Sequence, residues 1–142
     1  MEIVKGIKTS ETTVQETKHL MDTLGKRAIE IYEYPGFVTS RIILPMINTA
    51  VQVLMEGLAS ADDIDDAIHL GYNLSLGPLA LADQIGIDVV LDSLESIYRN
   101  LGDPTYRPSP LLRKMVREGK LGLKSGKGFF KYDERKRRIA TA

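Results

Sequence analysis

The chain of 142 residues contains no cysteine and only two histidines, His19 and His69. Disulfides and thiolate metal sites are therefore excluded, and so is a metal site built from several histidines. No apolar run reaches the roughly 20 residues that a membrane-spanning helix requires. The first ten residues include charged side chains where a signal peptide would need an apolar core. These absences predict a cytoplasmic protein that does not contact a membrane.

An excess of charge of either sign is also lacking, because 19 basic residues balance 19 acidic ones. A neutral chain without an RNA-binding signature argues against nucleic acid as a partner. Basic residues outnumber acidic ones between Arg113 and Arg138, and we interpret this stretch as a solvated face. Its last part, Arg135–Arg138, is expected to be a frayed end. The length leaves room for one domain, or for one domain with part of another.

Residues 1–34 have the pattern of a strand, a helix and a second strand. The stretches Glu2–Ile7 and Arg27–Tyr32 read as strands, and Thr9 or Ser10 can cap a helix between them. Such a unit belongs to a parallel sheet, which requires more strands and helices on both faces. None follow, so we interpret residues 1–34 as a β-α-β remnant of a larger α/β domain.

Residues 35–142 are expected to form a separate helical domain, which begins at the break Tyr34-Pro35-Gly36. Apolar residues recur there at helical spacing in five stretches. The stretches run from Val38 to Leu58, from Ser60 to Gly71, from Pro78 to Ile85, from Ile87 to Leu101 and from Ser109 to Gly119. The glycine-rich stretch Gly122–Tyr132 has no helical period and is predicted to pack as an extended strip. The predicted fold class is therefore mainly α, with the β-α-β remnant in front.

Local signals predict where several of these helices begin and end. Ser60 followed by Asp63 resembles a capping box, and Pro78 suits the first position of a helix. Ser109 is expected to cap the last helix. Gly71 is expected to end the helix that Ser60 begins.

The usual signatures of catalytic sites are missing. A dinucleotide-binding fold requires Gly-x-Gly-x-x-Gly directly after a strand, and the chain has no such motif. The stretch Lys124–Gly128 follows no clear strand and fails the P-loop pattern, so a phosphate site there is disfavoured. Neither histidine is paired with an acid and a serine in a triad signature. His69 is expected to have a local role near its helix end, with Asp65 one turn back.

From Pro35 onward, the order of short motifs resembles a known family. The motifs are Pro35-Gly36-Phe37-Val38, Arg41-Ile42, Glu56-Gly57, Asp63-Ile64-Asp65, Gly77-Pro78-Leu79 with Leu81 and Asp83, Tyr106-Arg107-Pro108, Gly119, Leu121-Gly122, Lys124, Gly126, Gly128-Phe129 and Tyr132. Each motif is weak alone, but their order and spacing resemble the C-terminal domain of 3-hydroxyacyl-CoA dehydrogenases. The resemblance covers essentially the whole chain and points most closely to bacterial 3-hydroxybutyryl-CoA dehydrogenases.

This resemblance implies roles for particular residues. Members of the family join an NAD-binding (Rossmann) domain to a helical domain that forms most of the dimer contact and one wall of the acyl-CoA cleft. Glu2 matches the glutamate that supports a catalytic histidine, and that histidine would lie upstream of Met1. Ser40 stands where the family often has an asparagine that reaches the 3-oxygen of the substrate. Leu76, Gly77 and Pro78 are expected to line the acyl side of the cleft.

The first hypothesis is thus the C-terminal half of an NAD-dependent 3-hydroxyacyl-CoA dehydrogenase of fatty-acid or butanoate metabolism. We expect the chain to form a homodimer, to bind acyl-CoA, to bind no NAD and to be inactive alone. A separate polypeptide could supply the NAD-binding domain. The alternative is a non-catalytic helical module for dimerisation or acyl-CoA binding. A third possibility is a related dehydrogenase that acts on another hydroxy acid.

Overall fold

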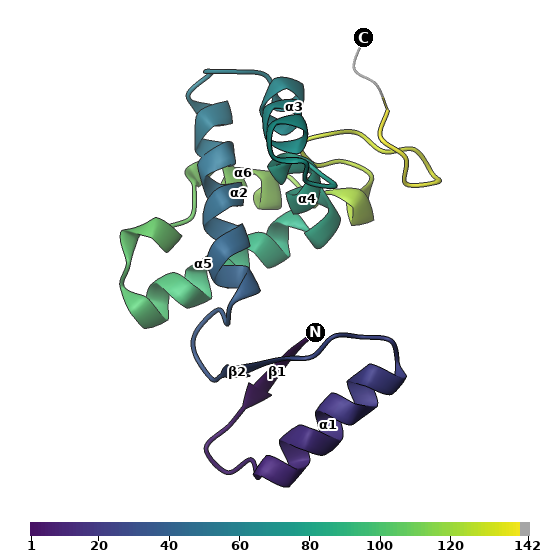
Figure 1. Ribbon diagram of the computed structural model, residues 1–142. Helices are drawn as coiled ribbons and strands as arrows, with labels where there is room; N and C mark the ends of the chain where they lie inside the picture. The colour runs from purple at the N-terminus through teal and green to yellow at the C-terminus, as the bar shows by residue number, and fades with distance from the viewer. Residues whose placement is uncertain (140–142) are drawn as a thin grey trace. The chain divides into compact units, whose positions relative to one another are not determined.

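In the computed structural model, which describes residues 1–139, the chain divides into two units after Arg41. The first unit contains a strand, a helix and a strand, and the second contains helices and two short 3₁₀ turns (Figure 1). The predicted fold class, mainly α with a β-α-β segment in front, is confirmed. The division into residues 1–34 and 35–142 as domains stays a prediction.

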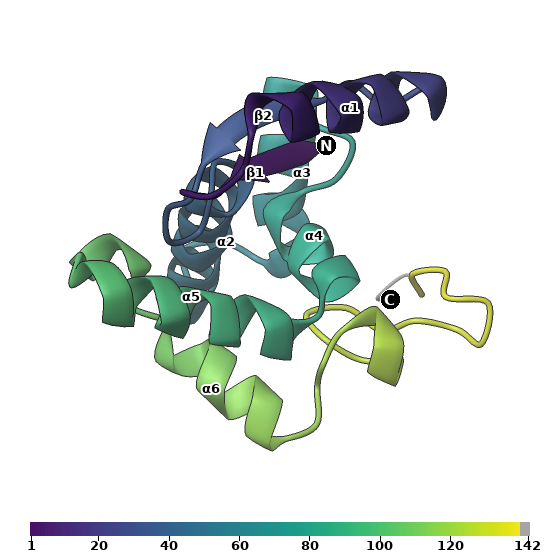
Figure 2. The same cartoon turned by 90° about the horizontal axis from the view of Figure 1, so that it is seen from below.

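The first unit consists of β1 (Glu2–Lys5), α1 (Glu11–Thr23) and β2 (Ile29–Tyr32). The two strands pair in parallel, and Figures 1 and 2 show α1 running along one side of the pair. The Ser10 hydroxyl accepts a hydrogen bond from the Thr13 amide and so caps α1. The predicted strand, helix and strand are confirmed, although both strands are shorter than the stretches read from the sequence.

The helices of the second unit are α2 (Thr39–Met55), α3 (Ala61–Tyr72), α4 (Pro78–Ile85), α5 (Ile87–Leu101) and α6 (Pro110–Arg117). The first three residues of α2 belong to the first unit. The 3₁₀ turns are η1 (Pro104–Tyr106) and η2 (Leu123–Ser125). The Ser60 and Ser109 hydroxyls cap α3 and α6, and Pro78 begins α4, as predicted. Figure 2 shows α5 and α6 side by side in this unit. Each of the five predicted helical stretches therefore corresponds to one α-helix.

The core of the second unit is continuous. Ile47, Leu79, Ile87, Leu94 and Leu112 have no more than a trace of exposed surface, and they come from four different helices. α5 contributes more residues to this core than any other helix, because its apolar residues recur every three or four positions and so share one face. Burial of a Leu or Ile side chain stabilises a fold by roughly 1.5–3 kcal/mol. The second unit thus has a continuous apolar core of the kind that stabilises a helical domain.

Two details differ from the expectations. Helix α3 continues past Gly71 and ends at Asn73, which adopts the left-handed conformation (φ 54°) and donates its amide to the His69 carbonyl. An asparagine can replace glycine at this position because its short side chain tolerates a positive φ. The stretch Arg135–Arg138 is not a frayed end. Arg137 pairs with Asp133, and Arg138 pairs with Asp62 and lies over the Phe130 ring.

Candidate functional site

Glu2, the glutamate predicted to support the catalytic histidine, is joined to the start of α2 by a hydrogen bond. One oxygen of its carboxylate accepts a hydrogen bond of 2.8 Å from the Thr39 amide, and Ser40 follows directly. The amides in the first turn of a helix lack partners within the helix and carry partial positive charge, which favours a carboxylate there. The structure therefore brings two of the predicted site residues, Glu2 and Ser40, to one place in the first unit.

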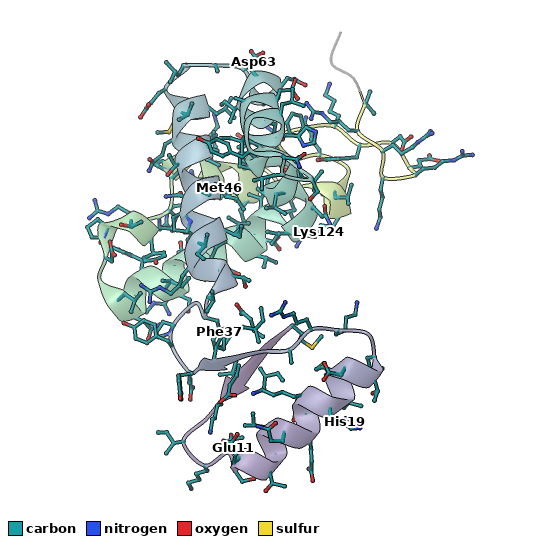
Figure 3. The ribbon with its side chains drawn as sticks, in the orientation of Figure 1. Glu11, His19, Phe37, Met46, Asp63 and Lys124 are labelled. Atoms are coloured by element: carbon teal, nitrogen blue, oxygen red, sulfur yellow. The ribbon has the colours of Figure 1, made fainter. Side chains whose placement is uncertain are left out.

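The turn before α2 determines where Ser40 lies. Gly36 and Phe37 both have positive φ, 83° and 49°, and the Phe37 amide donates to the Tyr34 carbonyl over 3.0 Å. The Arg41 guanidinium stacks over the Tyr34 ring at 4.9 Å from its centroid. Phe37 is about 42% exposed, and its side chain can be followed in Figure 3. A tight turn with two left-handed residues thus precedes the helix that carries Ser40.

The other predicted site residues, Leu76, Gly77 and Pro78, lie in the second unit. They belong to residues 73–78, here named the 73–78 loop, which consists of the connection between α3 and α4 and the first residue of α4. Pro78 is buried, whereas Leu76 is about 36% exposed. Gly77 is the N-terminal cap residue of α4. The apolar side chain of Leu76 is therefore partly exposed to solvent, directly before the buried residues Gly77 and Pro78.

Asp65 of α3 holds the start of α4. Its two carboxylate oxygens accept hydrogen bonds from the Leu79 and Ala80 amides, at 2.7 and 2.8 Å, and the residue is only 3% exposed. A Cβ atom on Gly77 would lie 2.3 Å from the Asp65 Cγ, so only glycine fits there. Burial raises the pKa of the Asp65 carboxyl, and the two amide donors oppose that rise. The Gly77-Pro78 motif is explained by this close approach.

Asp83 of α4 holds the glycine-rich strip in the same manner. Its carboxylate accepts hydrogen bonds from the Phe129 amide (2.9 Å), the Phe130 amide (3.0 Å) and the Tyr132 hydroxyl (3.0 Å). A Cβ on Gly128 would lie 1.9 Å from an oxygen of Asp83. Burial raises the pKa of Asp83, and burial beside this carboxylate raises the pKa of Tyr132. The strip is therefore a structural element attached to α4.

The lysine of the Lys124–Gly128 stretch has a structural partner as well. Its ammonium group pairs with Asp88 in the first turn of α5, at 2.5 and 2.6 Å from the two carboxylate oxygens. The stretch itself closes on Gly122 through a backbone bond of 2.9 Å from the Gly122 amide to the Lys127 carbonyl. Lys124 is labelled in Figure 3. These contacts support the reading of this stretch as something other than a phosphate loop.

Both histidines have settings that fit local roles. His19 lies exposed on α1. The Nδ1 atom of His69 hydrogen-bonds to the Leu74 carbonyl, so its ring faces the 73–78 loop. Asp65, which we expected to support His69, is instead directed to the amides of α4. Within residues 1–139, no group of three or more potential ligands could hold a metal ion.

An apolar groove of about 500 Å³ runs between α2 and α3. Met46 and Val53 of α2, Ile64 and Ile68 of α3, and Pro78 are among its walls. Met46, midway along α2, and Asp63, near the start of α3, can be found in Figure 3. The groove has the size of a ligand pocket, but it is open to solvent and almost wholly apolar, which is also typical of surfaces that proteins cover on association.

Among residues 1–139, no helix combines the length and the apolar character that crossing a membrane requires.

Comparison with known proteins identifies the family. A family model for the C-terminal domain of 3-hydroxyacyl-CoA dehydrogenase matches residues 36–132. A probable 3-hydroxybutyryl-CoA dehydrogenase of Bacillus subtilis (strain 168) is 47% identical over 135 residues, which is 95% of this chain and 47% of that protein. The mitochondrial hydroxyacyl-coenzyme A dehydrogenase of Homo sapiens is 34% identical over 133 residues, 93% of this chain and 42% of that protein.

Among solved structures, (S)-3-hydroxybutyryl-CoA dehydrogenase from Ralstonia eutropha matches with a TM-score of 0.88 and 47% identity. The match covers 94% of this chain and 47% of the other. The chain thus spans about half the length of the curated relatives that it matches. The chain belongs to the 3-hydroxyacyl-CoA dehydrogenase family, and residues 36–132 are its C-terminal domain.

Proposed function

We propose that this chain is the C-terminal half of an NAD-dependent 3-hydroxyacyl-CoA dehydrogenase that acts on short acyl chains such as 3-hydroxybutyryl-CoA in fatty-acid or butanoate metabolism. The family match over residues 36–132 carries this proposal. It is supported by relatives that are named 3-hydroxybutyryl-CoA dehydrogenases and are up to 48% identical. In this role the second unit forms one wall of the acyl-CoA cleft through Leu76, Gly77 and Pro78.

Glu2 and Ser40 supply complementary parts of the chemistry. The dehydrogenase reaction removes the proton of the substrate's 3-hydroxyl as hydride leaves C3, and a histidine in the family takes that proton. The carboxylate of Glu2 would stabilise the resulting imidazolium, since an opposite charge nearby favours the protonated ring. The hydroxyl of Ser40 would donate a hydrogen bond to the 3-oxygen, as the amide of an asparagine does. Their proximity at the start of α2 supports this division of roles.

NAD does not fit the residues of this chain. The chain has no Gly-x-Gly-x-x-Gly after a strand, and the Lys124–Gly128 stretch is occupied by its own contacts. We therefore expect the purified chain to give no NADH absorbance with 3-hydroxybutyryl-CoA and NAD. Turnover in that assay would contradict the proposal.

Binding separates the proposal from its alternative, a helical module that serves only for assembly. Titration of the chain with acetoacetyl-CoA in a calorimeter should give saturable heat, and titration with NAD should give none. A pure assembly module would give no heat with either ligand. Saturable heat with NAD would contradict the expectation that another polypeptide segment must bind it.

We also propose that a second copy of the chain covers the groove between α2 and α3. The groove is lined almost wholly by apolar atoms and is open to solvent. The two helices and their connection also carry exposed apolar side chains, including Met55 (49%), Leu58 (76%) and Leu70 (72%), and a soluble protein rarely leaves such a surface bare. In light scattering, Ala67→Glu, which puts a charge in the groove, should shift the chain from dimer to monomer. Ser96→Glu on α5, away from the groove, is the control and should remain a dimer. A monomeric wild-type chain would contradict this assignment.

A further inference from the structure

Two residues of α3, one helical turn apart, hold the two ends of the 73–78 loop. Asp65 accepts hydrogen bonds from the Leu79 and Ala80 amides just after the loop. His69 binds its beginning, because its ring Nδ1 contacts the Leu74 carbonyl while its backbone carbonyl accepts the Asn73 and Leu74 amides. Residues four apart on a helix lie on the same face, so one face of α3 supports the whole loop.

Packing fixes the end of this loop at Gly77 and Pro78, but it does not determine the position of residues 74–76. A hollow of about 190 Å³ lies against it, and Asp65, His69, Ser75 and Leu76 are among its walls. Leu74 and Leu76 are about 37% and 36% exposed, so neither is anchored in the core. A segment beside empty space is free to shift unless hydrogen bonds hold it. On α3, the side chains of Asp65 and His69 supply such hydrogen bonds, to the start of α4 and to the Leu74 carbonyl.

We propose that Asp65 and His69 are positioning residues that set the acyl specificity of this protein by holding the 73–78 loop in place. The inference rests on the proposed function, in which Leu76, Gly77 and Pro78 contact the acyl group. Neither residue touches the substrate; each acts through the loop. Their loss should therefore weaken recognition of the acyl group and leave recognition of the coenzyme A portion unchanged.

The test compares the affinity of the chain for acetoacetyl-CoA with its affinity for free coenzyme A, both by calorimetry. His69→Ala removes the donor to Leu74 and should reduce the ratio of the two affinities by about three- to tenfold, the range that loss of one hydrogen bond produces. His69→Asn should restore the ratio to within about twofold of wild type, because the Asn Nδ2 occupies the place of the His Nδ1 and donates likewise. His19→Ala, a matched change on exposed α1, should leave the ratio unchanged.

Asp65→Asn provides a second variant. The amide keeps one acceptor for α4 but sets an NH₂ group against the other backbone donor, so the ratio should fall at least as far as in His69→Ala. His69→Ala remains decisive if Asp65→Asn does not fold. A folded His69→Ala variant with the wild-type ratio would overturn the inference and leave the proposed function intact. A wild-type chain that binds no acetoacetyl-CoA would overturn the proposed function, and the inference with it.

Discussion

The two units of this chain differ in how they bury apolar side chains. In the first unit, only Val14 and Ile31 among the apolar residues are buried, whereas Ile7, Leu20 and Tyr32 are more than half exposed. In the second unit, sixteen buried apolar residues form one cluster drawn from every helix and the C-terminal strip. Helices satisfy their own backbone groups and can build a core with a few neighbours. A pair of parallel strands with one helix cannot, because both faces and both edges of the pair need cover.

The polar contacts differ in the same way. The carboxylates of Asp65 and Asp83 in the second unit are buried and accept two or three hydrogen bonds each. The ion pairs of the first unit keep more contact with solvent, since about a quarter or more of each side chain is exposed, as in the pair of Lys5 with Glu11. Exposed pairs contribute little to stability, whereas a buried acceptor left without a donor is costly. Most of the unfolding free energy should therefore reside in the second unit.

The largest effect is expected from the core. Leu94→Ala on α5 should lower the free energy of unfolding by about 3 kcal/mol, since Leu94 is fully buried. Val14→Ala changes the most buried position of the first unit. It should lower the free energy of unfolding obtained from the main urea transition by less than about 1 kcal/mol. Urea unfolding followed by circular dichroism at 222 nm measures both. Equal effects would contradict the difference between the units.

The next largest effect concerns the C-terminal strip. Gly128→Ala should destabilise the second unit by about 2–3 kcal/mol, because the added Cβ would meet Asp83 at 1.9 Å and break its hydrogen bonds. Gly71→Ala is the matched control. No atom lies within 4 Å of its added Cβ, so this change inside α3 should stabilise the chain by up to about 1 kcal/mol. Thermal unfolding distinguishes them, and a neutral Gly128→Ala would show that the strip is not held by Asp83.

A smaller effect is expected in the first unit, at the bond between Glu2 and Thr39. Glu2→Ala removes the acceptor and should speed exchange of the Thr39 amide about tenfold, equivalent to about 1.4 kcal/mol. Glu2→Gln keeps an oxygen acceptor and should leave that exchange close to wild type. NMR-detected hydrogen exchange at constant pH measures both variants. If the two variants exchanged alike, Glu2 would not position the start of α2 through this bond.

The smallest effect involves the ion pair of Lys124 with Asp88. The hydrogen bond from the ammonium group of Lys124 holds the pKa of Asp88 below its usual range. A carboxyl whose pKa is lowered on folding stabilises the fold above its unfolded pKa of about 4, and that contribution disappears as pH falls through the lower folded value.

Lys124→Met should therefore lower the free energy of unfolding by less than about 1 kcal/mol at pH 7, because the side chains of Lys124 and Asp88 are both about one-third exposed or more. The destabilisation should shrink as pH falls below about 4 and vanish once Asp88 is protonated in the folded chain. Urea titrations at several pH values would measure it, with Lys8→Met as a control of equal charge. A cost that did not change with pH would rule out this electrostatic origin.

Local sequence signals predicted the elements well, because their causes are local. Ser10, Ser60 and Ser109 cap helices, and Pro78 starts one, through groups within a few residues of each other. The left-handed Asn73 was missed because a glycine two residues earlier gave the stronger stop signal.

The site could be predicted only in part. Its contacts depend on tertiary structure, because they join residues far apart in the sequence. Glu2 and Thr39 are 37 positions apart, and Asp83 and Phe130 are 47 apart. A signal for the latter was present, since Asp83 is the one charged residue of a mainly apolar helix and glycines recur in the distant strip. The salt bridge of Arg138 with Asp62, which replaces the expected frayed end, had no local signal.

Hydrogen exchange of the whole chain, with and without acetoacetyl-CoA, tests the difference between the two units and the proposed site together. We predict slow exchange for the amides of α4 and α5, exchange at least about 100-fold faster in α1, and further slowing on ligand addition at residues 74–80. Uniform protection across both units would contradict the assignment of the stable core to the second unit. Slowing confined to residues outside the 73–78 loop and the start of α4 would contradict the placement of the acyl group there.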